Sequence, residues 1–269
     1  MNATDWLAYF RQNRLDRRGV AWHEGIAVDA SLREPLASSL ARFQLGESSN
    51  GMRLLAAARR LSGKTGDPAY SAAIELFIAE EQEHSRLLAK VLEQMNAPLL
   101  AYHWTDWLFR RCRHLLGFYE EIAVLLMAEI VALKYYGAIR KGCHAPVLEI
   151  VCEQILADEK FHVRFHCESL HEAIVKRAWP VRAACWLALS AMFVMASAVV
   201  AWDHRRVFSA LGCSAAEFLR DSWANFFAAR EAIFSGVAFA RGAAEQVPAE
   251  QGPRQLNRVL TSASRLFPH

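Results

Sequence analysis

The chain has 269 residues, of which 54% are hydrophobic, with only 13 glycines and 8 prolines. This length is sufficient to bury a core, and so few helix breakers favour an all-α fold over a strand-rich one. The net charge of +3 comes from 31 basic and 28 acidic residues, a balance that does not predict nucleic acid or an acidic protein as a partner.

The cysteines do not form a recognisable metal or disulfide framework. No C-x-x-C pair occurs among Cys112, Cys143, Cys152, Cys167, Cys185 and Cys213. A zinc knuckle, a rubredoxin-like iron site and a disulfide scaffold are therefore not supported. The first residues also lack the basic segment and apolar run of a secretory signal. We expect reduced thiols and a cytoplasmic protein, with membrane association left open.

Breaks rich in glycine, proline and asparagine predict long helices over 34–61, 68–95, 114–139, 146–175, 181–208 and 213–241. Asp67-Pro68 and Pro146 are typical helix starts. The segment 96–113 is long enough to cross the length of a bundle. We expect an N-terminal arm over 1–33, a four-helix bundle over 34–176, and additional helices with a C-terminal tail over 177–269.

One predicted helix is unusually apolar. The 20 residues from Ala183 to Trp202 contain no charge, which is about the length that spans a bilayer. The run is rich in alanine and serine, and a buried central helix of a large bundle has the same character. We favour the buried helix, with membrane contact as the alternative.

The apolar face of each of the first four helices is interrupted by an acid. In the second helix, Glu81 and His84 lie within a stripe from Ile74 to Met95. Helical residues three or four apart share a face, so an acid in such a stripe points toward the core. The acids are Glu47, Glu81, Glu129 and Glu159, and the histidines three residues after two of them are His84 and His162.

Carboxylates that converge in a core require positive charge. An ionised group there must find a partner or take up a proton, and the stripes contain no lysine or arginine. Two divalent cations would balance four carboxylates, and oxygen and imidazole ligands suit iron or manganese. The Glu-x-x-His spacing lets a carboxylate and an imidazole reach one metal. The sequence therefore predicts two metal ions, either iron or manganese.

Other acids compete with these candidates. Glu121 also precedes the apolar run of the third helix, but Glu129 lies inside the apolar sequence LLMAEIVAL and matches the phase of its stripe. In the second helix, Glu80 and Glu83 lie off the stripe and are expected to be solvated. The simplest alternative for both Glu-x-x-His motifs is a polar, solvent-facing helix surface.

One glutamate from each of two helices and a Glu-x-x-His from each of two others is the ligand set of di-iron and di-manganese bundles. On these residues the chain resembles the ferritin-like di-iron carboxylate superfamily, over Leu36 to Leu170. Glu47 and Glu81 lie 34 residues apart and Glu129 and Glu159 lie 30 apart, giving two similar halves. The resemblance implies a ferritin-like four-helix bundle with two additional C-terminal helices.

The resemblance also implies an oxygenase or oxidase in which the metal pair activates dioxygen to oxidise a small organic substrate. The only catalytic groups expected are the metal ligands, and an external donor must supply electrons because no cysteine cluster is present. A homodimer is compatible with such a protein. A dry apolar pocket is expected from Phe43, Phe77, Leu125 and Phe165.

Three other functions stay open. Iron or peroxide handling, as in ferritin or rubrerythrin, needs no organic substrate, although a cage-forming ferritin is usually shorter and a rubrerythrin would carry a C-x-x-C domain. A membrane-associated di-iron oxidase of a lipid or quinone would use the segment from Ala183 to Trp202. A helical interaction module, in which the acids are incidental, is the non-enzymatic alternative.

Several further polar residues have open roles. His166, one turn after His162, could contact a ligand or the substrate, join the metal as an extra ligand, or simply pack. The p-aminobenzoate N-oxygenases carry an additional histidine one turn before the motif, where this chain has Ile155. Tyr136 is a packing residue or contacts a ligand. Asp203 and His204 mark a helix end or contact a ligating histidine.

Overall fold

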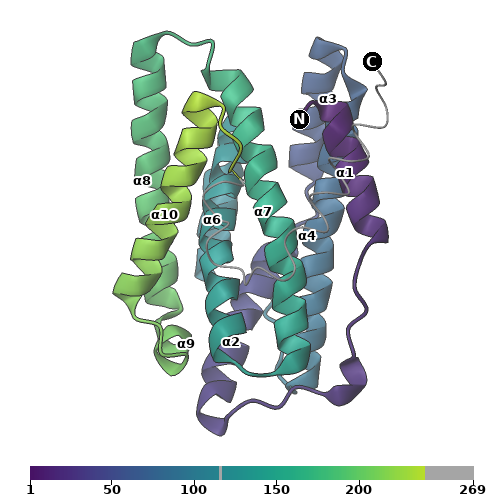
Figure 1. Ribbon diagram of the computed structural model, residues 1–269, viewed down its shortest axis with the longest axis vertical. Helices are drawn as coiled ribbons and strands as arrows, with labels where there is room; N and C mark the ends of the chain where they lie inside the picture. The colour runs from purple at the N-terminus through teal and green to yellow at the C-terminus, as the bar shows by residue number, and fades with distance from the viewer. Residues whose placement is uncertain (115–116, 240–269) are drawn as a thin grey trace, which may run out of the picture.

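The computed structural model describes residues 1–114 and 117–239 of the chain (Figure 1). All regular secondary structure in these ranges is helical, which confirms the all-α prediction. The elements are α1 (Ala3–Leu15), η1 (Trp22–Glu24), α2 (Ala30–Glu47), α3 (Met52–Thr65), α4 (Pro68–Gln94), α5 (Trp104–His114), α6 (Phe118–Gly142), α7 (Pro146–Ile174), α8 (Trp179–Asp203), α9 (Arg205–Ala210) and α10 (Ala215–Ser235).

Helices α2, α4, α6 and α7 form the part of the bundle that carries the predicted motifs. Helix α6 packs against α7, α2 against α4, and α4 against α7. The predicted starts are confirmed: the Asp67 side chain accepts a hydrogen bond from the Ala69 amide at 3.0 Å, and both α4 and α7 begin with proline. Their shared interior is lined by fully buried residues such as Ile74, Leu126 and Ile155.

The prediction of one helix over 34–61 is wrong, because the chain breaks after Glu47 and resumes at Met52. Gly51 adopts a left-handed conformation with φ of 61°, which favours glycine. A Cβ atom there would also lie 2.7 Å from the side chain of Ile78. The break makes Glu47 the last residue of α2, and it lets α3 pack as a separate helix on α4.

The segment predicted as an N-terminal arm contains α1, which lies alongside α4 (Figure 1). Trp6 is buried, with its ring 5.1 Å from that of Phe165 on α7. Tyr9 stacks on Phe161, with ring centroids 4.3 Å apart. The indole of Trp6 donates a hydrogen bond to Glu168 at 2.8 Å. The start of the chain is therefore part of the packed core.

The prediction that residues 183–202 form a buried central helix is wrong. Helix α8 lies at one edge of the molecule (Figure 1), and only 17% of its most apolar window is buried. One face, including Leu189 and Phe193, packs inward, while the rest is exposed. Among the described residues, α6 and α8 are long and apolar enough to cross a membrane. The predicted C-terminal tail falls largely within 240–269, outside the described residues.

Candidate metal centre

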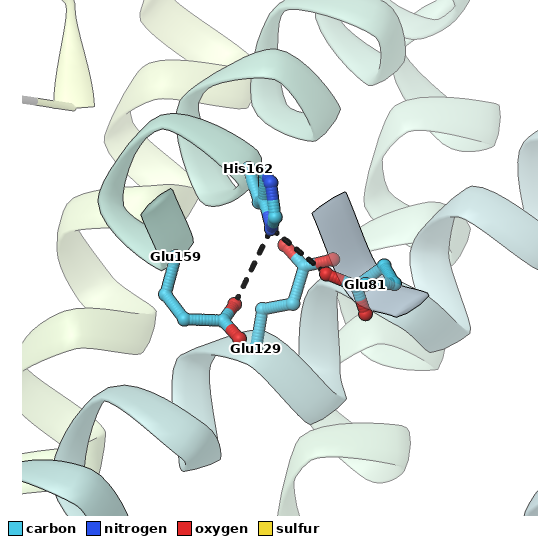
Figure 2. A group of neighbouring side chains, drawn as sticks. All are labelled: Glu81, Glu129, Glu159 and His162. Atoms are coloured by element: carbon cyan, nitrogen blue, oxygen red, sulfur yellow. Dashed lines mark ion pairs between the residues drawn. The ribbon is translucent and has the colours of Figure 1, made fainter. Parts of the chain in front are cut away.

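The six residues predicted as metal ligands come together between α2, α4, α6 and α7. One group consists of Glu81, Glu129, Glu159 and His162 (Figure 2), and an overlapping group consists of Glu47, His84 and Glu159. Within each group the ligand atoms all lie within 4.8 Å of one another. Glu159 belongs to both groups. The competitor Glu121 belongs to neither, although it is also buried.

The Glu-x-x-His motif on α4 faces the Glu-x-x-His motif on α7. The Nδ1 atom of His162 lies 3.0 Å from Oε1 of Glu81 and 3.7 Å from Oε2 of Glu159. The Nδ1 atom of His84 lies 3.7 Å from Oε1 of Glu81 and 3.5 Å from Oε1 of Glu159. Residues three apart share a helix face, which brings each carboxylate beside its own histidine. The packing of α4 on α7 then brings each carboxylate beside both imidazoles.

Several atoms of this cluster are buried without a hydrogen-bond partner. A polar atom in that situation costs about 1–3 kcal/mol, so a concentration of them needs an explanation. These atoms are Oε1 of Glu81, Oε2 of Glu129, Oε2 of Glu159, and the Nδ1 atoms of His84 and His162. They are oxygen and imidazole donors directed at a common interior space, and such a set fits divalent cations. The group could therefore hold a metal ion.

Most of the carboxylates and imidazoles of the cluster have raised pKa values, so in the absence of cations they hold protons. Burial raises the pKa of Glu47 and Glu129 well above the ordinary value, and it raises that of Glu159 to about 7. Burial also opposes ionisation of Glu81, but the close contact with His162 and the charge of that imidazole outweigh it and lower the pKa of Glu81 to about 2. Burial alone would lower the pKa of His84 and His162, but the neighbouring carboxylates outweigh it and raise both values.

A second pair of acids holds the outer side of both imidazoles. Nε2 of His162 lies 2.9 Å from Oε2 of Glu80, and Nε2 of His84 lies 2.9 Å from Oδ2 of Asp158. The contacts are crossed, because each acid comes from the helix opposite its histidine. Such carboxylate contacts fix the ring and its tautomer. With Nε2–H donating outward, each Nδ1 lone pair faces the cluster.

The expectation that Glu80 is solvated is therefore wrong, since its exposure is only 3%. Helix α1 lies over this part of α4 and excludes water. Glu83, by contrast, forms an ion pair with Arg86 at the surface.

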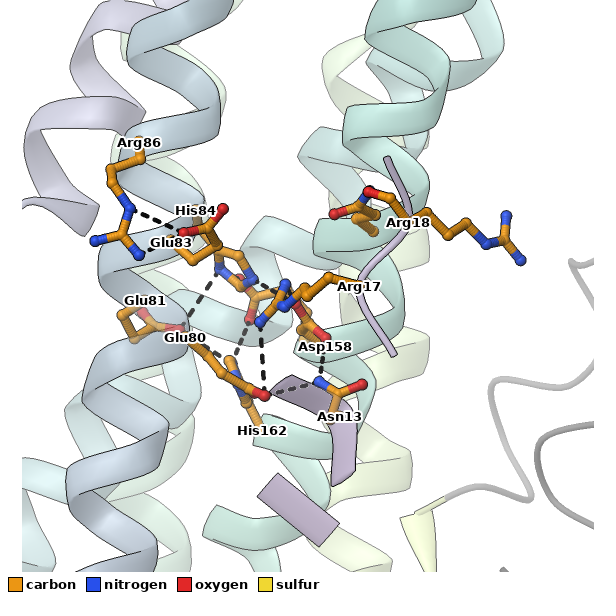
Figure 3. A network of polar contacts seen from close by, with 12 residues as sticks. Asn13, Arg17, Arg18, Glu80, Glu81, Glu83, His84, Arg86, Asp158 and His162 are labelled. Atoms are coloured by element: carbon orange, nitrogen blue, oxygen red, sulfur yellow. Dashed lines mark hydrogen bonds and ion pairs between the residues drawn. The ribbon is translucent and has the colours of Figure 1, made fainter. Parts of the chain in front are cut away.

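The N-terminal segment completes this outer layer (Figure 3). The Asn13 amide donates to both Glu80 and Asp158, each at 2.7 Å, and the Arg17 guanidinium donates to Asp158 at 2.6 Å. None of these four residues is among the site residues that the sequence predicts. Glu80 and Asp158 did leave a signal, because each motif has an acid directly before its glutamate. Nothing in the sequence indicated which segment would cover those acids.

His166 contacts a predicted ligand and lies outside both ligand groups. Burial, and then the charge of His162, lowers the pKa of His166 to about 3, so its imidazole is neutral. Its Nε2–H donates to Oε1 of Glu129 at 2.8 Å. Tyr136 has a comparable position, because its buried hydroxyl donates to Oε1 of Glu47 at 3.2 Å. Each therefore orients one carboxylate of the cluster.

Asp203 and His204 lie elsewhere. Asp203 is the last residue of α8 and pairs with Arg42 at 3.4 Å. Nδ1 of His204 lies 2.7 Å from the Ser39 hydroxyl on α2. This geometry favours the helix-end interpretation over contact with a ligating histidine.

Two of the four residues predicted to line an apolar pocket, Phe77 and Phe165, contact histidines at the centre. The ring of Phe77 lies edge-on to His162 at 4.8 Å and to His166 at 4.9 Å. Phe165 and Leu125 are buried, and Phe43 stacks on Tyr135 with centroids 3.7 Å apart. The apolar surroundings are present. An open pocket for a substrate stays a prediction.

Comparisons with known proteins do not add to this description. No protein-family model matches the chain, and no curated protein or solved structure matches it. The assignment of a metal centre rests on the geometry above.

Proposed function

We propose that the protein is a ferritin-like di-iron oxygenase or oxidase that uses dioxygen to oxidise a small organic substrate. The observation that carries the proposal is the convergence of Glu47, Glu81, Glu129 and Glu159 with the free Nδ1 atoms of two imidazoles. Four carboxylates balance the four positive charges of two ferrous ions. This donor set is typical of di-iron and di-manganese bundles.

Each predicted ligand has a place in this proposal. Glu159, the member common to both groups, would serve both metal positions, and Glu81 would lie beside it, within 3.7 Å of both imidazole Nδ1 atoms. Glu47 and His84 would complete one metal position. Glu129 and His162 would complete the other.

Bound iron would supply the redox chemistry that activates dioxygen. The chain's own residues keep the centre dry and oriented. Phe77 and its aromatic neighbours exclude water, which strengthens electrostatic interactions inside the site. His166 and Tyr136 hold the carboxylates of Glu129 and Glu47 by hydrogen bonds. Electrons would come from an external donor, since the described cysteines are separate free thiols.

The decisive experiment is anaerobic ferrous loading of metal-stripped protein, followed by exposure to dioxygen. We expect about two iron ions per chain, and a change in visible absorption that decays faster when a suitable substrate is added. Manganese loading in parallel tests the alternative metal. Iron uptake without any response to substrates would favour iron or peroxide handling. Failure to bind either metal would refute the proposal.

A further inference from the structure

The outer face of α8 is a continuous apolar surface that no helix of the described residues covers, and only Trp202 at its end contacts another aromatic ring, that of Trp104, with centroids 6.1 Å apart. Its exposed positions recur every three or four residues along the helix, and the segment between Arg182 and Asp203 contains no charge. Leu187 is 67% exposed and Met195 is 62% exposed, which is unusual for large apolar side chains. The exposed positions are Val181, Ala184, Leu187, Ala188, Ala191, Val194, Met195, Ala198 and Trp202.

Both ends of this face carry tryptophan and basic residues. Trp179 is 78% exposed at the start of the helix and Trp202 is 58% exposed near its end. Exposed Lys176 and Arg177 precede the first, while exposed Arg205 and Arg206 follow the second, with Arg206 paired to exposed Glu34 at 2.8 Å. The Arg205 guanidinium lies over the Trp202 ring at 5.0 Å. Tryptophan beside basic residues is typical of a protein surface at the boundary between lipid and water.

The surroundings of α8 argue against a membrane-spanning position. Helix α10 packs alongside α8 and exposes Arg220, Arg230 and Glu231. A bilayer around α8 would bring these charges into hydrocarbon, at a cost of several kcal/mol each.

The charges also argue against a second copy of the chain on this face. A parallel α8 pair would bring identical basic ends together. An antiparallel pair would bring Lys176 and Arg177 beside Arg205 and Arg206, which is again repulsive. The face is complementary to an apolar surface that carries negative charge.

We propose that this face binds the surface of an anionic lipid bilayer, with α8 lying in the plane of the interface. Its length of about 38 Å at 1.5 Å per residue would lie along the membrane. Leu187, Val194 and Met195 would enter the boundary between headgroups and acyl chains, and the two tryptophans would lie at headgroup level. The basic ends would pair with lipid phosphates. This inference does not depend on the metal centre.

The test is flotation of the full chain with vesicles of phosphatidylcholine mixed with phosphatidylglycerol, compared with phosphatidylcholine alone. We expect binding to the anionic vesicles, weakened by salt, with a blue shift of tryptophan emission. The double variant Leu187→Glu/Met195→Glu should lower the bound fraction about tenfold or more, because it places charge in the apolar boundary. Met52→Glu, at a 61% exposed position on α3, is the matched control and should bind as the wild type does.

A second variant tests the basic ends. Lys176→Glu/Arg177→Glu should weaken binding to anionic vesicles while leaving the helix content unchanged. Absence of wild-type binding would overturn the proposal, as would binding that Leu187→Glu/Met195→Glu does not alter. A wild-type dimer that this double variant makes monomeric would instead assign the face to a second copy.

Discussion

The metal centre and the outer face of α8 depart from the usual distribution of residues in opposite ways. The centre buries carboxylates and imidazoles, whereas the outer face exposes leucine, methionine and tryptophan. Buried polar groups and exposed apolar patches are the informative departures, since isolated exposed apolar residues are common. In the centre, partly unsatisfied polar atoms converge on one another. On α8, the described chain offers no covering element. The first pattern could hold a metal ion, and the second is suited to contact with another apolar surface.

The largest effect is expected from removing Glu159, the carboxylate common to both ligand groups. Glu159→Ala should abolish binding of both metals, because neither position then keeps its shared ligand. Metal content after anaerobic loading measures the effect. Glu83→Ala, on the outside of α4, is the control and should retain both metals. A Glu159 variant that keeps both metals would contradict the assignment.

The same substitution on the inner and outer apolar surfaces should have very different effects on stability. Leu126→Ala removes a fully buried side chain of α6 and should cost about 2–5 kcal/mol. Leu187→Ala, on α8, should change the free energy of unfolding by less than about 0.5 kcal/mol. Denaturant unfolding in the absence of lipid measures both. Similar losses would show that the α8 face is covered in solution.

The stability of the metal-free protein should fall as pH rises from about 6.5 to 8. Unfolding returns Glu159 to an ordinary pKa, whereas the folded chain keeps its proton up to about pH 7. A group with a raised folded pKa stabilises the protein at low pH, and that contribution is lost as pH rises through the folded value. The raised pKa values of Glu47, Glu129, His84 and His162 act in the same direction.

Each proton concerned changes the stability by up to about 1.4 kcal/mol per pH unit. Thermal unfolding of metal-free and metal-loaded protein across this pH range provides the measurement. Bound cations replace the protons, so the loaded protein should lose this dependence. The lowered pKa of His166 changes the stability only at pH values below the ordinary pKa of histidine. It therefore does not oppose the fall in stability between about pH 6.5 and 8. A metal-free midpoint that rises with pH would contradict the prediction.

The outer polar layer should have a smaller effect than the ligands it supports. Asn13→Ala and Arg17→Ala should each lower metal affinity about 10–100-fold, because Glu80 and Asp158 would then hold the imidazoles less firmly. Anaerobic titration with ferrous iron measures the change. Arg14→Ala, exposed on the same helix, should leave the affinity unchanged. Equal affinity in all three variants would confine α1 and the segment that follows it to a packing role.

The smallest effect is expected for His166→Ala. The histidine donates a hydrogen bond to Glu129 and lies outside both ligand groups, so two metals should remain bound. Metal analysis of the loaded variant measures this. Loss of one metal equivalent would make His166 a ligand.

Sequence periodicity predicted the inner side of the site and not its outer layer. The stripe pattern identified the six residues that converge, because helical phase decides which side chains face a neighbour. It selected Glu129 over Glu121 for the same reason. It missed the crossed contacts of Glu80 and Asp158 with the opposite histidines, which depend on how α4 packs against α7. The cover provided by Asn13 and Arg17 was equally invisible, since it joins segments about 70 and 140 residues apart.

The errors in the fold have a similar origin. The stripe of the first predicted helix continues past Glu47, and the break depends on the conformation of Gly51 against Ile78. For α8, the composition indicated an apolar environment, but it did not show whether the rest of the protein or a membrane provides that environment. Helix α6 is equally long and slightly less apolar, and 78% of its most apolar window is buried. It differs by carrying Glu129 and Tyr136, which require partners. For these two apolar helices, polar residues within the helix were therefore a better sign of burial in the protein than apolar content was.

The break after α2 makes the two halves of the centre unequal. Glu47 ends its helix, whereas the other five predicted ligands lie within helices. A carboxylate at a helix C-terminus faces the negative end of the helix dipole, which disfavours the ionised form that a metal ion needs as a ligand. Its group also has three members, against four in the other group. The two ions should therefore load in sequence, with the position of Glu129 and His162 filling first and that of Glu47 and His84 acting as the exchangeable one.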